Sequence, residues 1–259
     1  MRIAINKDNG KAVITAGKTV WNLFLDCLYP RRCPVCGEIV MPKDRLICPD
    51  CERQISRVEE PVCKRCGRQV TDETTEYCPD CMRRSHAFDQ GVSLCNYNEA
   101  ARKSMGKIKY QGRREYLDFY GTELAKRFGK QMMQIGADAL VPVPVHPERK
   151  RKRGFNQAEV LAVRISEELE KQQGRTIPVR ADLLFRTKKT LPQKDLSAAE
   201  RLKNLESAFE AGAIPPDIRR VILVDDIYTT GSTADACAKT LKRAGISGVY
   251  VVTACIGSQ

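Results

Sequence analysis

The spacing of hydrophobic residues changes several times after residue 90, in the order that an α/β domain requires. Short apolar runs predict strands at 92–97, 139–145, 183–187, 221–224 and 248–256, the last of which closes the sheet. Apolar residues at helical spacing predict helices at 99–110, 115–135 and 156–173, and another helix begins near 232. Because strands alternate with helices, the pattern predicts a mostly parallel sheet with helices on both faces. Ligands of such sheets bind where the strands end.

Residues 13–29 also show helical spacing, which predicts an amphipathic helix within residues 1–32. This helix could dock on the protein's own core or lie on a membrane surface, and Asp26 argues against the membrane. No apolar run has the length of a transmembrane helix, and no apolar core with a cleavage site marks a signal peptide. We therefore expect a protein of the reducing cytoplasm.

Residues 33–81 contain an internal repeat of cysteines. Both copies, 33–51 and 63–81, read C-x2-C-G-x10-C-P-D-C. Two thiolates from one tight turn can reach the same metal ion, and two such turns complete a tetrahedral zinc site. Four thiolates leave no position for water, so two structural zinc ions are expected; sites within each repeat and interleaved sites both fit the spacing. The expected ligands are Cys33, Cys36, Cys48, Cys51, Cys63, Cys66, Cys78 and Cys81.

The run VILVDDIYTTGST, residues 221–233, combines several groups that suit one ligand. Asp225 and Asp226 end a buried strand, where adjacent carboxylates can accept hydrogen bonds from the two vicinal hydroxyls of a ribose. The next loop supplies hydroxyl donors and a glycine that lets the backbone wrap around an anion. The helix after it points free N–H groups at a phosphate. The arrangement fits a ribose 5-phosphate group, bound by the loop residues Thr229, Thr230, Gly231, Ser232 and Thr233.

A basic run forms a second candidate element. Residues 141–157 follow a strand, lead into a helix and contain five consecutive cations, Arg149 to Arg153, before Gly154. Because arginine suits bidentate phosphate contacts, we expect a loop that faces pyrophosphate through Arg149, Arg153 and Gly154. A solvated basic loop is the alternative. The polar segment 187–209 lies between two predicted strands, where a lid over the site would be placed.

The net charge of +12 is concentrated in one part of the chain. Residues 1–90 hold 15 Lys/Arg and 13 Asp/Glu, a net of +2, whereas residues 91–259 hold 29 and 19, a net of +10. The basic excess therefore belongs to the C-terminal part. Its partner should be polyanionic: a pyrophosphate ligand, a nucleic acid, or both.

The run 221–233 resembles the phosphoribosyl pyrophosphate (PRPP) signature of the type I phosphoribosyltransferases. Four further features accompany it: the C-x-x-C repeats, IKYQGR (108–113), VPVP with RGFNQ, and a lid pattern T-x5-Q-x2-L-x4-R-x2-N. Together they resemble the ComF family of competence-associated proteins over residues 20–257. The resemblance implies a double zinc ribbon at 33–90 ahead of a type I phosphoribosyltransferase domain at 91–259. It also implies a role in handling incoming single-stranded DNA during natural transformation.

Carried over to this chain, the resemblance implies that Asp225 and Asp226 hold the ribose hydroxyls and are the catalytic residues of any transferase reaction. It implies that Thr229 to Thr233 bind the 5-phosphate and that the Arg149–Gly154 region faces pyrophosphate. Mg²⁺ would accompany PRPP. Other competence proteins, such as helicase or recombination machinery, are the implied protein partners.

Three functions are compatible with these features. The first is a DNA-handling protein that binds PRPP and single-stranded DNA, with Tyr97, Tyr110, Tyr116 and Phe155 as candidates for base stacking. The second is a salvage phosphoribosyltransferase acting on a free base, and the third is a PRPP-sensing regulator. The basic excess and the zinc ribbons favour the first. Thr229 stands where many purine-base transferases carry an acidic general base, and the nearby His146 suits a base or a helix cap equally well.

Overall fold

A parallel sheet of four strands, in the order β1-β6-β5-β2, forms the centre of the computed structural model, which describes residues 28–187 and 208–257. All three neighbouring pairs run parallel, so the strands end at the same edge. The predicted fold class is confirmed. The strand at 248–256 lies inside the sheet, between two neighbours. The strands are β1 (Gln90–Asn96), β2 (Ala139–Pro142), β5 (Arg220–Tyr228) and β6 (Gly248–Ile256).

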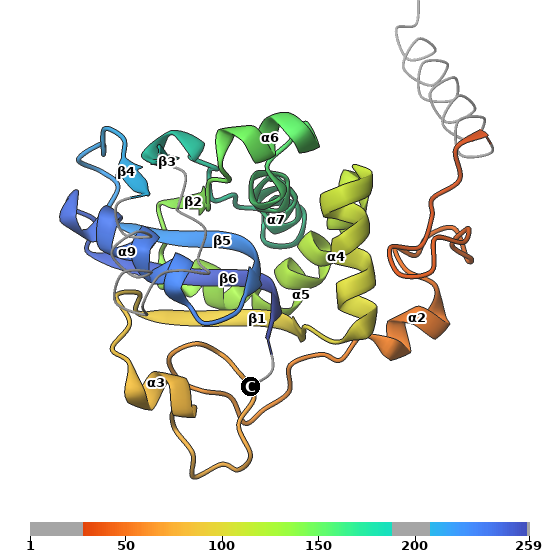
Figure 1. Cartoon of the computed structure of the whole chain (residues 1–259), viewed down its shortest axis with the longest axis horizontal. Helices are drawn as coiled ribbons and strands as arrows, with labels where there is room; N and C mark the ends of the chain where they lie inside the picture. The colour runs from red at the N-terminus through yellow and green to blue at the C-terminus, as the bar shows by residue number, and fades with distance from the viewer. Residues whose placement is uncertain (1–27, 188–207, 258–259) are drawn as a thin grey trace, which may run out of the picture.

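Helices cover both faces of this sheet (Figure 1). α5 (Leu117–Ile135) and α7 (Gln157–Gln173) pack against each other and against one face, with α4 (Glu99–Gln111) beside them. A short 3-10 turn, η1 (Arg114–Tyr116), joins α4 to α5. α9 (Ser232–Arg243) packs against β5 and β6 from the other face. The helical spacing thus predicted α4, α5 and α7 correctly.

The side chains of β5 point alternately to the two faces of the sheet, which explains why helices must cover both faces. Ile222 and Val224 join the hydrophobic core beneath α5 and α7, whereas Val221 and Leu223 join the core beneath α9. Side chains of a strand point to opposite faces in turn, so a strand that is apolar at every position must be buried on both sides. After the exposed Arg220 at the start of the strand, the next polar positions are Asp225 and Asp226, towards its C-terminal end.

One predicted strand has a different place from the one expected. β3 (Leu184–Arg186) follows the turn η2 (Ala181–Leu183) and pairs antiparallel with β4 (Phe209–Ala211), in a separate sheet of two strands. An apolar run identifies a strand but not its partner. β3 and β4 bracket the predicted lid, of which residues 188–207 lie outside the described residues.

The two cysteine repeats join different hydrophobic cores. Cys33 and Cys51 of the first repeat belong to the core formed with α4 and α5, and the helix α2 (Pro49–Gln54) carries Cys51. Cys63 and Cys66 of the second repeat belong to the core beneath α9, and α3 (Pro79–Arg83) follows them. In Figure 1, α2 lies to the right of α4, and α3 lies below β1.

Residues 1–27, which contain most of the predicted N-terminal helix, lie outside the described residues. Among the helices that the structure describes, none is long and apolar enough to cross a membrane. The division into a ribbon unit ending near residue 90 and a second unit beginning there stays a prediction.

Candidate functional site

The eight repeated cysteines form two compact groups of four sulfur atoms. Within each group all Sγ atoms lie within 4.8 Å of one another. The Cys36–Cys48 distance is 3.8 Å and the Cys66–Cys78 distance is 3.7 Å. Four thiolates about 2.3 Å from a tetrahedral zinc ion would lie about 3.8 Å apart. The geometry therefore fits one structural zinc ion within each repeat and disfavours interleaved sites. The groups are Cys33, Cys36, Cys48, Cys51 and Cys63, Cys66, Cys78, Cys81.

Backbone hydrogen bonds favour the metal-binding form of one of these thiols, that of Cys33. Burial opposes ionisation of Cys33, but hydrogen bonds from the backbone of Cys48, Cys36 and Val35 outweigh it and lower the pKa of the thiol to about 7. A thiol must lose its proton to ligate zinc, so these N–H groups favour the liganding form.

Asp225 and Asp226 lie at the C-terminal end of β5, as predicted, and their surroundings differ. Asp226 is buried and its Oδ2 lies 2.8 Å from Nζ of Lys109 on α4. Its backbone N–H donates to Oδ1 of Asp225 at 2.8 Å. Burial and the neighbouring charge of Asp226 raise the pKa of Asp225 to about 8. The surroundings of the pair therefore favour a proton on Asp225.

The loop after β5 leads directly into α9. Thr229 and Thr230 are exposed, and the hydroxyls of Thr230 and Ser232 lie 2.9 Å apart. Gly231 caps the helix with a φ of 76°, and a Cβ added there would lie 2.3 Å from the Tyr228 hydroxyl. Only glycine fits this turn. The first turn of α9 leaves backbone N–H groups without partners in the helix, which suits an anion.

The basic run forms a helix instead of the predicted loop. α6 (Pro147–Arg153) begins with proline at its first position and ends at Gly154, whose φ is 82°. His146 caps it by accepting from the Glu148 N–H at 3.3 Å, so the capping alternative for this histidine holds. Proline at a helix start, glycine at its end and long cationic side chains between them all favour a helix. The run lacks apolar periodicity, so the hydrophobic pattern alone does not reveal this helix.

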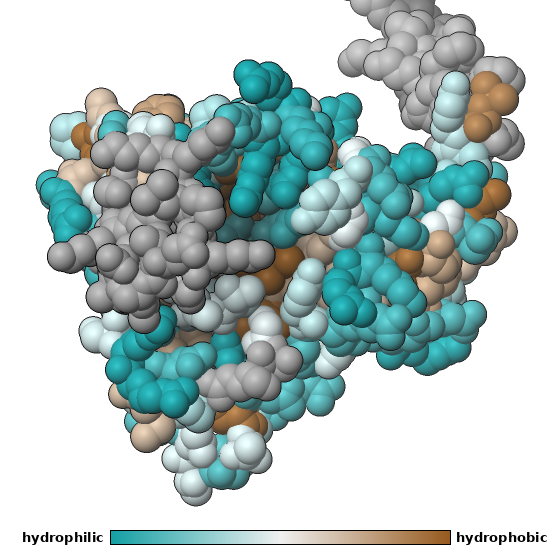
Figure 2. All heavy atoms as spheres, viewed as in Figure 1, coloured by the Kyte–Doolittle hydropathy of each residue, from teal (hydrophilic) through white to brown (hydrophobic). Residues whose placement is uncertain are grey.

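α6 carries its charges close to α4. Arg153 donates to Oε1 of Gln157 at 2.8 Å, and its guanidinium lies 5.8 Å from the centre of the Tyr110 ring. Lys150 pairs with Glu159 of α7 at 3.3 Å. Residues 149–152 are exposed. Figure 2 shows hydrophilic residues over α6, above a hollow that contains hydrophobic residues.

Two residues near this site were not predicted from the sequence. Lys109 reaches Asp226 from α4, and its only signal is its place in the IKYQGR stretch. Arg186, on β3, is part-buried, and burial together with the charge of Arg149 lowers the pKa of its guanidinium, while Asp225 opposes that shift. Arg186 thus lies within electrostatic reach of both the basic helix and the aspartate pair.

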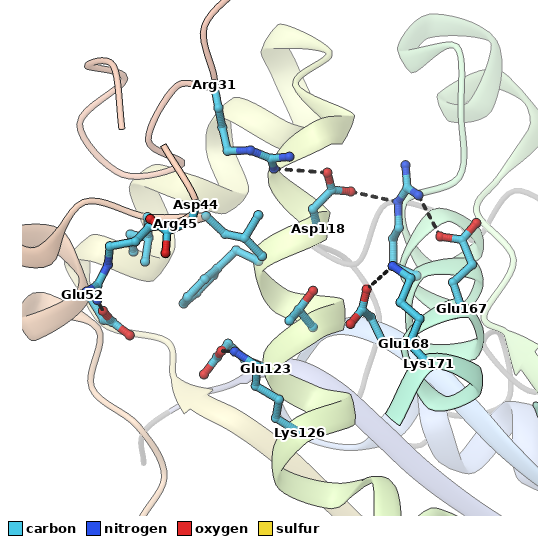
Figure 3. A pocket seen from close by; sticks show the side chains of 15 residues that line it. Arg31, Asp44, Arg45, Glu52, Asp118, Glu123, Lys126, Glu167, Glu168 and Lys171 are labelled. Atoms are coloured by element: carbon cyan, nitrogen blue, oxygen red, sulfur yellow. Dashed lines mark hydrogen bonds and ion pairs between the residues drawn. The ribbon is translucent and has the colours of Figure 1, made fainter. Parts of the chain in front are cut away.

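A cleft elsewhere in the molecule has a different character (Figure 3). It has a volume of about 520 Å³ and lies where the first cysteine repeat meets α5 and α7. Arg31 contacts Asp118 at 3.3 Å, and Arg164 contacts the same carboxylate at 2.8 Å. Its lining carries acidic and basic side chains in similar number, and none belongs to the loop 225–233. This cleft is a charged boundary between the first cysteine repeat and the helices α5 and α7.

The sheet, the two Cys₄ groups and the strand–loop–helix at 220–243 define a protein that joins a double zinc ribbon to a parallel α/β unit. A family model for the double zinc ribbon domain matches residues 24–82. Competence protein F of Haemophilus influenzae is 31% identical over 176 residues, which cover 66% of this chain and 74% of that protein. The chain belongs to the ComF family.

Other relatives agree with this assignment. Competence protein ComFC of Bacillus subtilis is 25% identical over 225 residues, 82% of this chain and 72% of that protein. DNA utilization protein YhgH of Escherichia coli K12 is 36% identical over 118 residues, 46% of this chain and 49% of that protein. A purine phosphoribosyltransferase from Pyrococcus horikoshii superposes with a TM-score of 0.32 at 14% identity, over 54% of this chain and 82% of that chain.

Proposed function

We propose that this ComF family protein binds PRPP at the C-terminal end of β5 and uses that site in handling single-stranded DNA during natural transformation. One observation carries the proposal. The buried Asp226 and the part-buried Asp225 lie at the end of β5, next to the glycine-capped N-terminus of α9, and the basic helix α6 follows the end of the neighbouring parallel strand β2. PRPP has a matching sequence of groups: two ribose hydroxyls, a 5-phosphate and a pyrophosphate.

Each group of PRPP has a candidate partner of suitable charge. Asp226, and Asp225 once it loses its proton, would accept hydrogen bonds from the ribose hydroxyls. Thr229 to Thr233 and the first turn of α9 would bind the 5-phosphate. Arg149 and Arg186 would face the pyrophosphate, for which arginine is suited. Mg²⁺ would arrive with the pyrophosphate and neutralise part of its charge.

The DNA part of the proposal rests on charge and on the names of the relatives. Two of them are named competence proteins and another a DNA utilization protein. The exposed cations of α6 form a short basic surface, and Tyr110 beside it is 80% exposed. An exposed ring next to arginine suits stacking of a base from a single strand. Tyr116 is only 4% exposed, so it is no longer a candidate for stacking.

Titration of the purified protein tests the proposal against the free-base alternative. Calorimetry measures binding of three kinds of ligand: PRPP with Mg²⁺, free purine and pyrimidine bases, and a short single-stranded oligonucleotide. A separate assay measures pyrophosphate release. The proposal expects binding of PRPP and of the oligonucleotide. Pyrophosphate release that depends on a free base, with no oligonucleotide binding at low salt, would favour the salvage enzyme instead.

A further inference from the structure

The side chain of Arg68 connects the second cysteine repeat to the loop after β5. Arg68 is 6% exposed, and its Nη2 donates to the Thr229 carbonyl at 2.8 Å. Its Nη1 lies 3.4 Å from Oδ2 of Asp80, which is part of α3 between two of the cysteines. A buried guanidinium that holds a backbone carbonyl fixes the position of that carbonyl, because leaving either group unpaired is costly.

Arg68 is itself fixed by the turn that presents two cysteines. Its carbonyl accepts from the Cys63 N–H at 2.7 Å, and its backbone N–H is hydrogen-bonded to the Cys66 sulfur. Gly67 between them has a φ of 72°, and a Cβ there would come within 2.5 Å of the Gly91 carbonyl at the start of β1. The geometry of this turn therefore sets where the Arg68 side chain begins.

His86 and Ala87, which follow α3, are hydrogen-bonded to the first turn of α9. Asp235 accepts from the Ala87 N–H at 2.8 Å and pairs with Nδ1 of His86 at 2.8 Å. The His86 side chain is fully buried and stacks on Phe88, with ring centres 4.9 Å apart. A Cβ at Gly231 would also lie 3.1 Å from Cε1 of His86. Residues 86–87 thus contact both the first turn of α9 and its cap residue Gly231.

The first cysteine repeat makes contacts of another kind. Its Val35 carbonyl accepts from Lys107 of α4 at 2.7 Å, and Arg31 before it pairs with Asp118 of α5. Both of these contacts go to helices on the opposite side of the sheet from α9. The two repeats are alike in sequence and differ in what they touch, so they supply a comparison within one molecule.

We infer that the second zinc ribbon positions the 5-phosphate loop, with Arg68 as the positioning residue, so that metal binding at Cys63–Cys81 and binding of a ribose phosphate favour each other. This inference rests on the proposed PRPP site. Coupling between two sites is reciprocal. A metal that orders Arg68 makes the loop ready for the phosphate, and a phosphate that orders the loop makes the ribbon hold its metal more tightly.

Protection of the metal ligands in the wild-type protein tests this coupling without any substitution. The zinc-loaded protein is exposed to EDTA and N-ethylmaleimide with Mg²⁺ in excess over EDTA throughout, with and without PRPP, and alkylation of each cysteine is followed by mass spectrometry. PRPP should slow alkylation of Cys63, Cys66, Cys78 and Cys81 by about 5-fold or more. The rate for the four cysteines of the first ribbon should not change. Equal protection of both ribbons, or of neither, would overturn the inference.

Substitution of Arg68 supplies the second test. Arg68→Ala should weaken binding of ribose 5-phosphate and PRPP by about 5-fold or more, with affinity for inorganic pyrophosphate and the zinc content unchanged. Arg68→Lys should restore part of the affinity.

The matched control Arg31→Ala removes an ion pair between the segment before the first repeat and helix α5, and should leave all three affinities unchanged. Unchanged PRPP affinity in Arg68→Ala contradicts the inference, whereas a wild-type protein that does not bind PRPP contradicts the proposed function itself. If Arg68→Ala does not fold, the protection experiment decides.

Discussion

Asp225 and Asp226 are neighbours in the chain, but their surroundings differ. Lys109 lies 2.8 Å from Asp226, while burial and the charge of Asp226 raise the pKa of Asp225 to about 8. The sequence predicted both aspartates at a strand end, because a buried strand followed by carboxylates leaves few other interpretations. It could not predict Lys109, because α4 and β5 are far apart in the chain and only the folded sheet brings them together.

Replacement of Asp225 should reveal its raised pKa as a pH-dependent gain in stability. A carboxyl with a folded pKa of about 8 and an unfolded pKa near 4 binds a proton more tightly in the folded state. Its stabilising effect is therefore complete at low pH and is lost as the pH rises to about 8. Because asparagine cannot ionise, the melting temperature of Asp225→Asn should rise relative to wild type between about pH 4 and about 8, then stay level. A difference that is constant over this range would argue against the raised pKa.

At the scale of elements, the apolar pattern predicted the sheet and most helices, and failed where polar residues form the element. β1, β5, β6, α4, α5 and α7 all carry a buried face, so their periodicity is visible in the sequence. α6 has no buried residue among those described, and its helix is set by Pro147 and Gly154 at its ends. For β3 the limit was different: its apolar run identified a strand but could not identify β4 as its antiparallel partner.

Charge on α6 should contribute to DNA binding through phosphate contacts. Arg151 and Lys152 are exposed, and alanine at both positions keeps the helix while removing two cations. Affinity of the double variant for a single-stranded oligonucleotide should fall for all sequences alike. The slope of log K against log salt should become shallower by about 0.7 for each phosphate that the variant no longer neutralises.

The matched control for this experiment is the pair Lys126→Ala and Lys130→Ala on α5, which removes the same charge from exposed positions on another helix. An unchanged salt slope in the α6 variant, or an equal change in the α5 variant, would contradict a specific role for α6.

At the scale of the whole molecule, the two ribbons are built into the cores of the α/β unit. The cysteine spacing predicted two Cys₄ groups, and the family match to a double zinc ribbon agrees with them. The contacts of the ribbons with the sheet could not be predicted, since they join residues such as Arg68 and Thr229 that are 161 positions apart. Local patterns identify elements, and long-range contacts depend on how those elements pack.

Elemental analysis of the purified protein should find two zinc ions per chain. Removal of both with a chelator should lower the melting temperature of the α/β unit as well, because Cys33, Cys51, Cys63 and Cys66 are part of its hydrophobic cores. Absence of zinc from freshly purified protein would contradict the assignment, and one zinc per chain would mean that only one ribbon is loaded.

Calorimetric titration of PRPP with Mg²⁺ into wild type and Asp226→Ala tests whether the end of β5 binds PRPP. The substitution removes a charge-assisted acceptor worth about 1.5–3 kcal/mol, so PRPP affinity should fall by roughly tenfold or more. Zinc content should stay at two per chain, and the exposed control Asp217→Ala should bind as wild type does. Equal PRPP affinity in Asp226→Ala and wild type would contradict the account.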